Sequence, residues 1–119
     1  MKEILIVDDQ HAIRLLLQEV FKQEGYMTHI ASNGIDAMSM FESKNIDCIL
    51  LDMKIPGMDG IGILRHLKER GVTVPVVMMS GHSEQQIIKQ ANELGVTAYF
   101  TKPFDIFKVR DEVNKLVMA

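Results

Sequence analysis

The sequence has no tryptophan, three prolines and a single cysteine among its 119 residues. A lone cysteine, Cys48, excludes an internal disulfide and any metal site built from several cysteines, and it fits a reducing compartment. No apolar run approaches the 18 residues of a membrane span, and the first residues lack the long apolar stretch of a signal peptide. We therefore expect a cytoplasmic protein that does not enter a membrane.

Basic residues are also scarce. Lys and Arg number 13 against 16 Asp and Glu, which gives a net charge of −3. Because the phosphate backbone of nucleic acids binds to basic faces, we expect no nucleic-acid partner. A content of 47% hydrophobic and 24% charged residues is typical of a globular protein. The length suits one domain, which we place at residues 1–119 and expect to be a monomer.

Five short apolar segments alternate with five segments of helical periodicity. In the first pair, an unbroken run of branched residues stops at two acids, and the apolar residues after it recur at helical spacing as far as Gly25. Such alternation predicts an α/β fold, a doubly wound sheet of parallel strands with helices on both faces. The expected strands are residues 4–7, 27–31, 47–51, 74–79 and 97–100. The expected helices run from Gln10 to Gly25, over 34–41, over 61–70, and after the capping residues Ser83 and Asp105.

Polar side chains follow four of the expected strands. Since ligands of open α/β sheets bind outside the carboxyl ends of the strands, we expect these side chains to converge on one rim. Three carboxylates and one ammonium leave a charge of −2, which a divalent cation would balance. Oxygen ligands without a nearby His or Cys favour Mg²⁺. The residues are Asp8, Asp9, Asp52, Ser80 and Lys102.

This set of side chains suits phosphoryl transfer. Mg²⁺ and Lys102 would hold a phosphoryl group between them, and the Ser80 hydroxyl would donate to a further oxygen. Asp52 stands apart from the adjacent pair at 8–9, so it is the better nucleophile, since carboxylates form acyl phosphates. Each residue alone is a weak signal, because acids and lysines at strand ends are usually only solvated. The combination carries the hypothesis.

Four segments resemble the receiver domains of two-component response regulators, and the resemblance covers essentially the whole chain. It implies a (βα)5 flavodoxin-like fold whose five-stranded parallel sheet has the order 2-1-3-4-5. The segments are Val7-Asp8-Asp9, the run from Leu51 to Gly60, Met79-Ser80-Gly81-His82 and Thr101-Lys102-Pro103-Phe104. Two departures are visible: Ser80 stands where Thr is common, and Gly81 stands where Ala is common.

The resemblance also implies a role for each residue of the rim. Asp52 would accept a phosphoryl group from a phosphohistidine, Lys102 would pair with the phosphoryl oxygens, and Ser80 would donate a hydrogen bond to one of them. Ser80 and Tyr99 would form a two-state switch, and Pro103 would follow a cis peptide bond. The implied Mg²⁺ ligands are Asp9, Asp52, the backbone carbonyl of Lys54 and, largely through water, Asp8.

Two further groups of residues flank this rim. Lys54 and His82 occupy the positions at which receivers tune the lifetime of the phosphoryl group; otherwise they are solvated polar side chains. The apolar stripe of the first helix is wider than a core needs, so it offers a partner helix a surface, unless the surplus is plain core. The partner would be a histidine kinase or a histidine phosphotransfer bundle. The expected partner surface is Gln10, Ile13, Leu16, Pro103 and Phe104.

We therefore expect a phosphoacceptor that catalyses its own phosphorylation and dephosphorylation and acts by onward transfer or by protein contact. One alternative is a receiver fragment of a longer regulator whose output domain follows. A Mg²⁺-dependent phosphatase of the haloacid dehalogenase type would need a second Asp where Lys54 stands. A flavin or nucleotide binder would need a Gly-rich loop where Asp8 and Asp9 stand. A degenerate receiver would lack some of the chemical positions, all of which are present.

Overall fold

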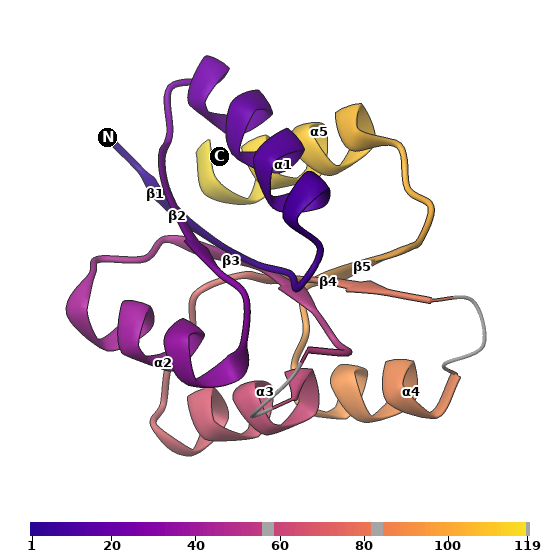
Figure 1. The fold of residues 1–119 in the computed structure, drawn as a ribbon. Coiled ribbons are helices and arrows are strands. Elements are labelled where there is room, and N and C mark those ends of the chain that lie inside the picture. The colour runs from indigo at the N-terminus through magenta and orange to yellow at the C-terminus, as the bar shows by residue number, and fades with distance from the viewer. Residues whose placement is uncertain (56–58, 82–84, 119) are drawn as a thin grey trace.

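The computed structural model describes residues 1–55, 59–81 and 85–118. Strands and helices alternate through the chain, as the pattern predicts (Figure 1). The strands are β1 (Glu3–Val7), β2 (Met27–Ala31), β3 (Cys48–Asp52), β4 (Val76–Ser80) and β5 (Ala98–Thr101). The helices are α1 (His11–Gln23), α2 (Gly34–Ser43), α3 (Gly60–Glu69), α4 (Gln85–Glu93) and α5 (Ile106–Met118).

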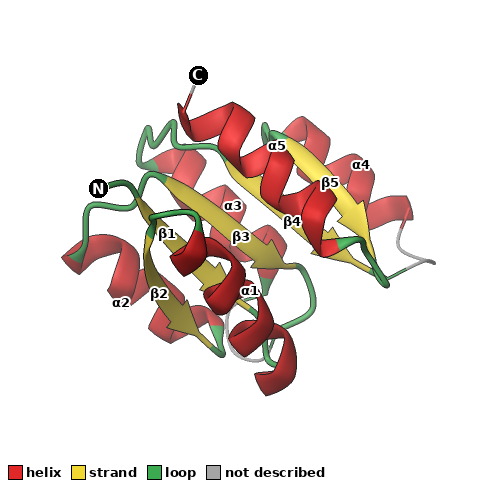
Figure 2. Cartoon of the chain, turned by 90° about the horizontal axis from the view of Figure 1, so that it is seen from above, coloured by secondary structure: helices red, strands yellow, loops and turns green. Residues whose placement is uncertain are grey.

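The five strands form one parallel sheet with the order β2-β1-β3-β4-β5, so the predicted α/β fold and strand order are confirmed. All five arrows point the same way in Figure 2. The chain first moves from β1 outward to β2 and then crosses back to β3 on the other side of β1. In the register of the sheet, Val7 lies opposite Leu51, and Asp52 lies opposite Met79. The strand order therefore reverses between β1 and β3, where ligands of such sheets bind.

Helices cover both faces of the sheet. Helices α1 and α5 lie on one face, and α2, α3 and α4 lie on the other (Figure 1). Successive residues of β1 alternate between the two apolar cores, because side chains of a strand point to opposite faces. The core under α1 and α5 includes Ile4, Ile6, Leu17, Phe21, Leu50, Val77, Met79, Val109 and Val113. The core under the other helices includes Leu5, Val7, Ile49, Leu51, Ile63, Leu64, Leu67, Met78 and Ala91.

Short polar side chains cap the amino ends of α2, α3 and α5. The Asn33 side chain accepts a hydrogen bond from the backbone of α2, and the Asp59 side chain does so for α3. Asp105 Oδ1 accepts from the backbone N–H of Phe107 at 2.9 Å, which confirms the predicted cap before α5. Gly25 follows α1 with a φ of 91°, a left-handed conformation that glycine adopts without strain. The predicted cap at Ser83 lies outside the described residues.

Three strands extend one residue further toward their carboxyl ends than the pattern predicts. Asp52 and Ser80 were expected just past their strands, but both belong to the ladder, and Asp52 lies opposite Met79. The reason is that backbone pairing continues through a polar residue as long as the neighbouring strand continues. Hydropathy marks where burial ends, which is earlier. The observed strands replace the predicted 47–51, 74–79 and 97–100.

The longest helices, α1 and α5, have 13 residues each. A membrane-spanning helix needs about 20 apolar residues. Within residues 1–55, 59–81 and 85–118, no helix has both the length and the apolar character to cross a bilayer.

Candidate functional site

Three carboxylates meet at the carboxyl ends of β1 and β3. Carboxylate oxygens of Asp8, Asp9 and Asp52 all lie within 4.8 Å of one another. Asp8 is fully buried and Asp52 is 5% exposed, whereas Asp9 is exposed. The neighbouring positions of β1 and β3 in the sheet bring together residues that are more than 40 positions apart in the sequence. The sheet therefore assembles the acidic rim that the sequence predicted.

Both carboxylate oxygens of Asp8 accept hydrogen bonds from within the protein. The backbone N–H of Gln10 donates to Oδ1 at 2.9 Å, and the Lys102 ammonium donates to Oδ2 at 2.9 Å. Gln10 also reaches the lysine, because its Oε1 accepts from Lys102 Nζ at 3.4 Å. A buried carboxylate is costly unless it is paired and hydrogen-bonded, and these bonds meet that requirement for Asp8.

Lys102 binds the two buried carboxylates at once. Its Nζ donates to Asp8 Oδ2 at 2.9 Å and to Asp52 Oδ2 at 3.2 Å. Burial alone would lower the pKa of Lys102, but the hydrogen bonds and the negative charges of Asp8 and Asp52 outweigh burial and raise it. The backbone N–H of Lys102 donates to the Ser80 carbonyl at 2.7 Å, which fixes the end of β5 against β4. The lysine is thus held charged at the centre of the site.

Asp52 lies between the lysine and the backbone of the segment after β3. Its Oδ1 accepts from the N–H of Lys54 at 3.1 Å, and its Oδ2 accepts from Lys102. Burial raises the pKa of Asp52, and the charge of Asp8 adds to this effect. The hydrogen bonds from Lys54 and Lys102 act in the opposite direction without cancelling it. A further cation beside Asp52 would therefore stabilise its ionised form.

Ser80 is the one residue of the described chain with a buried side-chain oxygen or nitrogen that lacks a hydrogen-bond partner. The residue is 1% exposed and ends β4, next to Thr101 of β5 in the register. A buried hydroxyl without a partner costs free energy in a folded protein. An oxygen-rich group bound at this rim would supply the missing partner, so the orphaned Ser80 hydroxyl points to a ligand.

The chemistry of the donors suits a hard divalent cation. The three carboxylates offer only oxygen atoms, and with Lys102 they leave a charge of −2. Mg²⁺ binds through one or two carboxylates and keeps positions for water and for phosphate oxygens. Asp9 is the exposed member of the acidic cluster, so it is open to such a cation from solvent. The residues present therefore fit Mg²⁺.

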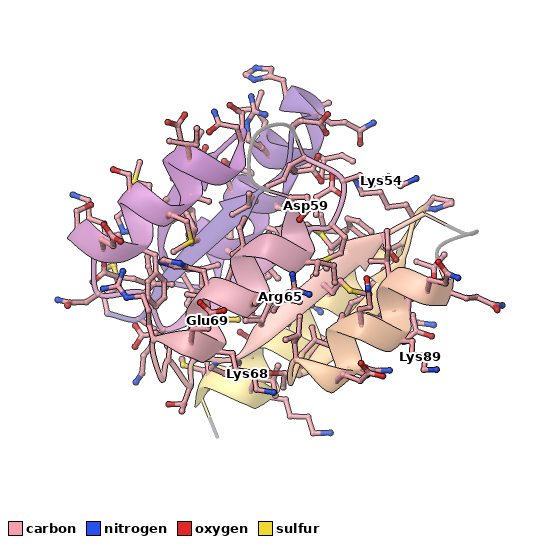
Figure 3. All side chains as sticks on the ribbon, turned by 90° about the horizontal axis from the view of Figure 1, so that it is seen from below. Lys54, Asp59, Arg65, Lys68, Glu69 and Lys89 are labelled. Atoms are coloured by element: carbon pink, nitrogen blue, oxygen red, sulfur yellow. The ribbon has the colours of Figure 1, made fainter. Side chains whose placement is uncertain are left out.

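The residues predicted to tune and switch the site lie at its margin. Lys54 is exposed at the start of the segment that leads to α3, where Figure 3 labels it. Tyr99 lies opposite Met78 in the sheet and is 45% exposed, so its ring is on the outside of β5 in this structure. His82 lies outside the described residues. The roles predicted for these residues stay predictions.

The predicted partner surface forms one continuous feature, which we call the α1–α5 groove. It is a cavity of about 470 Å³ between the first turns of α1 and the segment after β5. Leu16 is 52% exposed at its edge, whereas Leu17 beside it is fully buried in the core. The Lys102–Pro103 peptide bond is cis, as the resemblance implies. The groove is lined by the five predicted residues Gln10, Ile13, Leu16, Pro103 and Phe104, together with Lys102 and Ile106.

Two contacts of the site have no clear signal in the sequence. Arg14 Nη1 donates to the backbone carbonyl of Asp8 at 2.7 Å, although Arg14 stands among apolar residues of α1 without any motif around it. Gly60 lies so close to Met53 that a Cβ at Gly60 would be 2.6 Å from the Met53 Cα. The turn residues near Gly60 predict a loop, but only the fold shows what the glycine approaches.

Comparison with known proteins agrees with this geometry. The family model described as the response regulator receiver domain matches residues 4–114. Sporulation initiation phosphotransferase F of Bacillus subtilis (strain 168) is 48% identical over 114 residues, which cover 96% of this chain and 92% of that protein. Regulatory protein AtoC of Escherichia coli (strain K12) is 36% identical over 114 residues, and the match spans 96% of this chain but only 24% of AtoC.

Comparison with solved structures also finds a receiver domain. The receiver domain of the Francisella response regulator 1452 superimposes with a TM-score of 0.92 at 28% sequence identity, over 99% of this chain and 98% of that one. The family model, the sequence relatives and the fold all agree. The chain therefore belongs to the response regulator receiver domain family.

Proposed function

We propose that this receiver domain accepts a phosphoryl group from a phosphohistidine onto Asp52 in a Mg²⁺-dependent reaction. The observation that carries the proposal is the arrangement around one carboxylate. Asp52 touches Lys102 on one side, lies within 4.8 Å of two further acids, and shares the rim with the unpartnered Ser80 hydroxyl. The three oxygens of a phosphoryl group need such groups for charge balance and for hydrogen bonding.

In the reaction, a carboxylate oxygen of Asp52 attacks the phosphorus of the donor. A P–O bond forms, the P–N bond to the donor imidazole breaks, and the imidazole nitrogen keeps the electron pair and takes up a proton. Lys102, already charged and 3.2 Å from Asp52, neutralises the phosphoryl oxygens, and Ser80 donates its hydrogen bond to one of them. Onward transfer to another histidine reverses the same bond changes.

Asp8, Asp9, Asp52 and the backbone carbonyl of Lys54 would hold the Mg²⁺. When bound, Mg²⁺ supplies positive charge that the phosphoryl group and three carboxylates require. The chain contributes the rest, because it fixes Asp8 with two hydrogen bonds, holds Lys102 charged, and leaves Asp9 open to solvent.

We propose the α1–α5 groove as the surface that meets the histidine-bearing partner. The groove begins at the site itself, because Gln10 and Lys102 line both. Its remaining lining is apolar, with Leu16 half exposed at the edge. An amphipathic helix that inserts apolar residues there would bring a histidine on its surface close to Asp52. A histidine kinase or a histidine phosphotransfer bundle presents such a helix.

The relatives support two proposals for the mode of output. Similarity to a sporulation initiation phosphotransferase supports onward phosphotransfer, and a role in sporulation is the corresponding pathway proposal. The match to AtoC, of which this chain spans 24%, supports the alternative that the domain serves a longer regulator with an output domain. The extent of the domain at 1–119, the cytoplasmic location, the monomeric state and the lack of a nucleic-acid partner stay predictions.

The test is phosphorylation by acetyl phosphate, read by intact mass, with and without Mg²⁺. We expect the wild type to gain one phosphoryl group only when Mg²⁺ is present, and Asp52→Asn to gain none. The matched control is Asp111→Asn, an exposed acid on α5 that pairs with Arg110 away from the rim. Labelling of Asp52→Asn, or labelling of the wild type without Mg²⁺, would overturn the proposal.

A further inference from the structure

Arg14 makes an unusual contact for a residue in the first turns of a helix. Its Nη1 donates to the carbonyl oxygen of Asp8, the first residue of the loop between β1 and α1, at 2.7 Å. Its Nη2 lies 3.3 Å from His11 Nδ1, and because a guanidinium only donates, the imidazole nitrogen is the acceptor. Two contacts therefore fix the guanidinium over the loop of residues 8–10.

This position is unfavourable for a cation as far as the helix alone is concerned. The amino end of a helix carries partial positive charge, and α1 has neither an acidic residue in its first turn nor a side chain that caps it. A lysine or arginine there adds to the positive potential instead of offsetting it. The charge of Arg14 is therefore balanced outside the helix, and the acidic rim that begins at Asp8 is next to it.

Asp8 is the residue through which Arg14 acts on the rim. The side chain of Asp8 is fully buried, and its two carboxylate oxygens bind the Gln10 N–H and Lys102. The backbone of Asp8 is held on one side by β2, since its N–H donates to the Ala31 carbonyl at 3.1 Å. Arg14 binds the carbonyl on the other side of the same residue. The main chain of Asp8 is thus fixed at both ends of the residue, and its carboxylate is fixed with it.

We propose that Arg14 is a positioning residue for the reaction at Asp52. Within the described part of the chain, Arg14 contacts neither Asp52 nor Lys102. It acts by holding the Asp8 backbone, so that the Asp8 carboxylate keeps its hydrogen bonds to Lys102 and to the Gln10 N–H. This inference rests on the proposed function, because it concerns the same Mg²⁺ site. Groups that orient metal ligands from outside the ligand set typically change metal affinity by about 10- to 100-fold.

The experiment compares Arg14→Ala, Arg14→Lys and the control Arg65→Ala. Arg65 is exposed on α3, on the opposite face of the sheet from α1, so its replacement removes the same charge without touching Asp8 (Figure 3). Mg²⁺ affinity is measured by titration in the absence of any phosphodonor. We expect Arg14→Ala to weaken Mg²⁺ binding roughly tenfold, Arg14→Lys to recover part of the loss, and Arg65→Ala to change it less than about twofold.

A second measurement needs no metal. Hydrogen exchange of the Gln10 amide reports its bond to Asp8 Oδ1, and we expect exchange about tenfold faster in Arg14→Ala and unchanged in Arg65→Ala. Urea unfolding of each variant separates a loss of positioning from a loss of stability. Where Arg14→Ala does not fold, Arg14→Lys is measured in its place, because lysine keeps the charge and a donor nitrogen but lacks the planar guanidinium.

The outcomes of the two proposals can be told apart. A folded Arg14 variant with wild-type Mg²⁺ affinity and wild-type exchange at Gln10 overturns the role of Arg14, even when Asp52 is phosphorylated normally. The same weakening in Arg65→Ala also overturns it, because the effect would then be charge alone. A wild type that binds Mg²⁺ but is never phosphorylated overturns the proposed function and leaves the Arg14 result standing.

Discussion

Asp8 and Lys102 are 94 positions apart in the sequence, yet Lys102 Nζ donates to Asp8 Oδ2 at 2.9 Å at the carboxyl end of the sheet. The same ammonium reaches Asp52 at 3.2 Å, so one cation serves two buried carboxylates while a third, Asp9, is close by. The three carboxylates and the one ammonium therefore leave the site two positive charges short of balance before any metal or phosphoryl group binds. Several consequences of this imbalance, and of the packing around it, can be measured.

Replacement of Asp52 by Asn should stabilise the metal-free protein. Burial and the charge of Asp8 raise the pKa of Asp52, so its ionised form is disfavoured in the folded state. We expect Asp52→Asn to raise the free energy of unfolding in urea by about 1 kcal/mol at pH 7, whereas the exposed control Asp111→Asn should stay within about 0.5 kcal/mol. Saturating Mg²⁺ should remove the advantage, because it binds the ionised wild type.

The pH dependence of this effect has a definite sign. A carboxyl group whose pKa is higher in the folded state contributes stability that is complete below its unfolded value of 3.8 and is lost as the pH rises from there through the higher folded value. The advantage of Asp52→Asn should therefore be large at neutral pH and shrink below about pH 4. An advantage that is the same at pH 3 and pH 7 would contradict the origin in charge.

Gly60→Ala should destabilise the protein, although Gly→Ala inside a helix ordinarily stabilises by about 1 kcal/mol. The new Cβ would lie 2.6 Å from the Met53 Cα, and a backbone atom cannot give way as a flexible side chain can. We expect a loss of about 1–3 kcal/mol in urea unfolding and weaker Mg²⁺ binding, because the displaced segment includes the neighbour of Asp52. A stabilised Gly60→Ala variant would show that the close approach relaxes without cost.

Cys48 should be inert in the folded protein. The residue is fully buried in β3, and burial, with the charge of Asp47 as a smaller cause, raises the pKa of its thiol from 9.0 to about 12. Since the thiolate is the reactive form, a thiol reagent at pH 8 should modify Cys48 only in the unfolded state. The unfolded thiol ionises first, so stability should fall between pH 9 and 12, and Cys48→Ala should lack this part of the fall.

Lys54→Ala should shorten the lifetime of the phosphorylated form. The exposed Lys54 side chain begins two residues after Asp52 and can obstruct a water molecule that attacks the acyl phosphate. We expect autodephosphorylation about threefold faster in the variant, followed as loss of the phosphorylated mass. Lys89→Ala on α4 is the matched control, and Figure 3 shows both lysines. An unchanged or slower rate in Lys54→Ala would refute the expectation.

Leu16→Ala should separate partner-dependent from partner-independent phosphorylation. Leu16 is 52% exposed and lines the α1–α5 groove, whereas its neighbour Leu15 is 48% exposed on the same helix outside the groove lining. We expect Leu16→Ala to slow phosphotransfer from a phosphohistidine donor protein about tenfold while labelling by acetyl phosphate stays as in the wild type. Leu15→Ala should affect neither rate, and equal losses in both variants would argue against the groove.

The arrangement of elements could be predicted from the sequence because it depends on local patterns. Apolar runs such as 4–7, helical spacing after them, and the stop at Gly25 each reflect the chain's own periodicity and turn chemistry. The polar residues at the strand ends predicted the rim, since parallel strands bring their carboxyl ends to one edge. The exact strand ends at Asp52 and Ser80 were harder to predict from the sequence, because they depend on how far the neighbouring strand continues.

Only the tertiary structure decided which hydrogen bonds and ion pairs form at the acidic rim. Three features of the rim depend on how its segments pack. Lys102 bridges Asp8 and Asp52, the Ser80 hydroxyl is left without a partner, and Arg14 binds the Asp8 carbonyl. Sequence patterns report which face of a helix or strand is buried, but not which atoms meet across it. Local periodicity thus determined the α/β alternation and the acidic edge, and the resemblance to receiver domains supplied the strand order. The balance of charges at that edge arises from packing of residues that are far apart in the sequence.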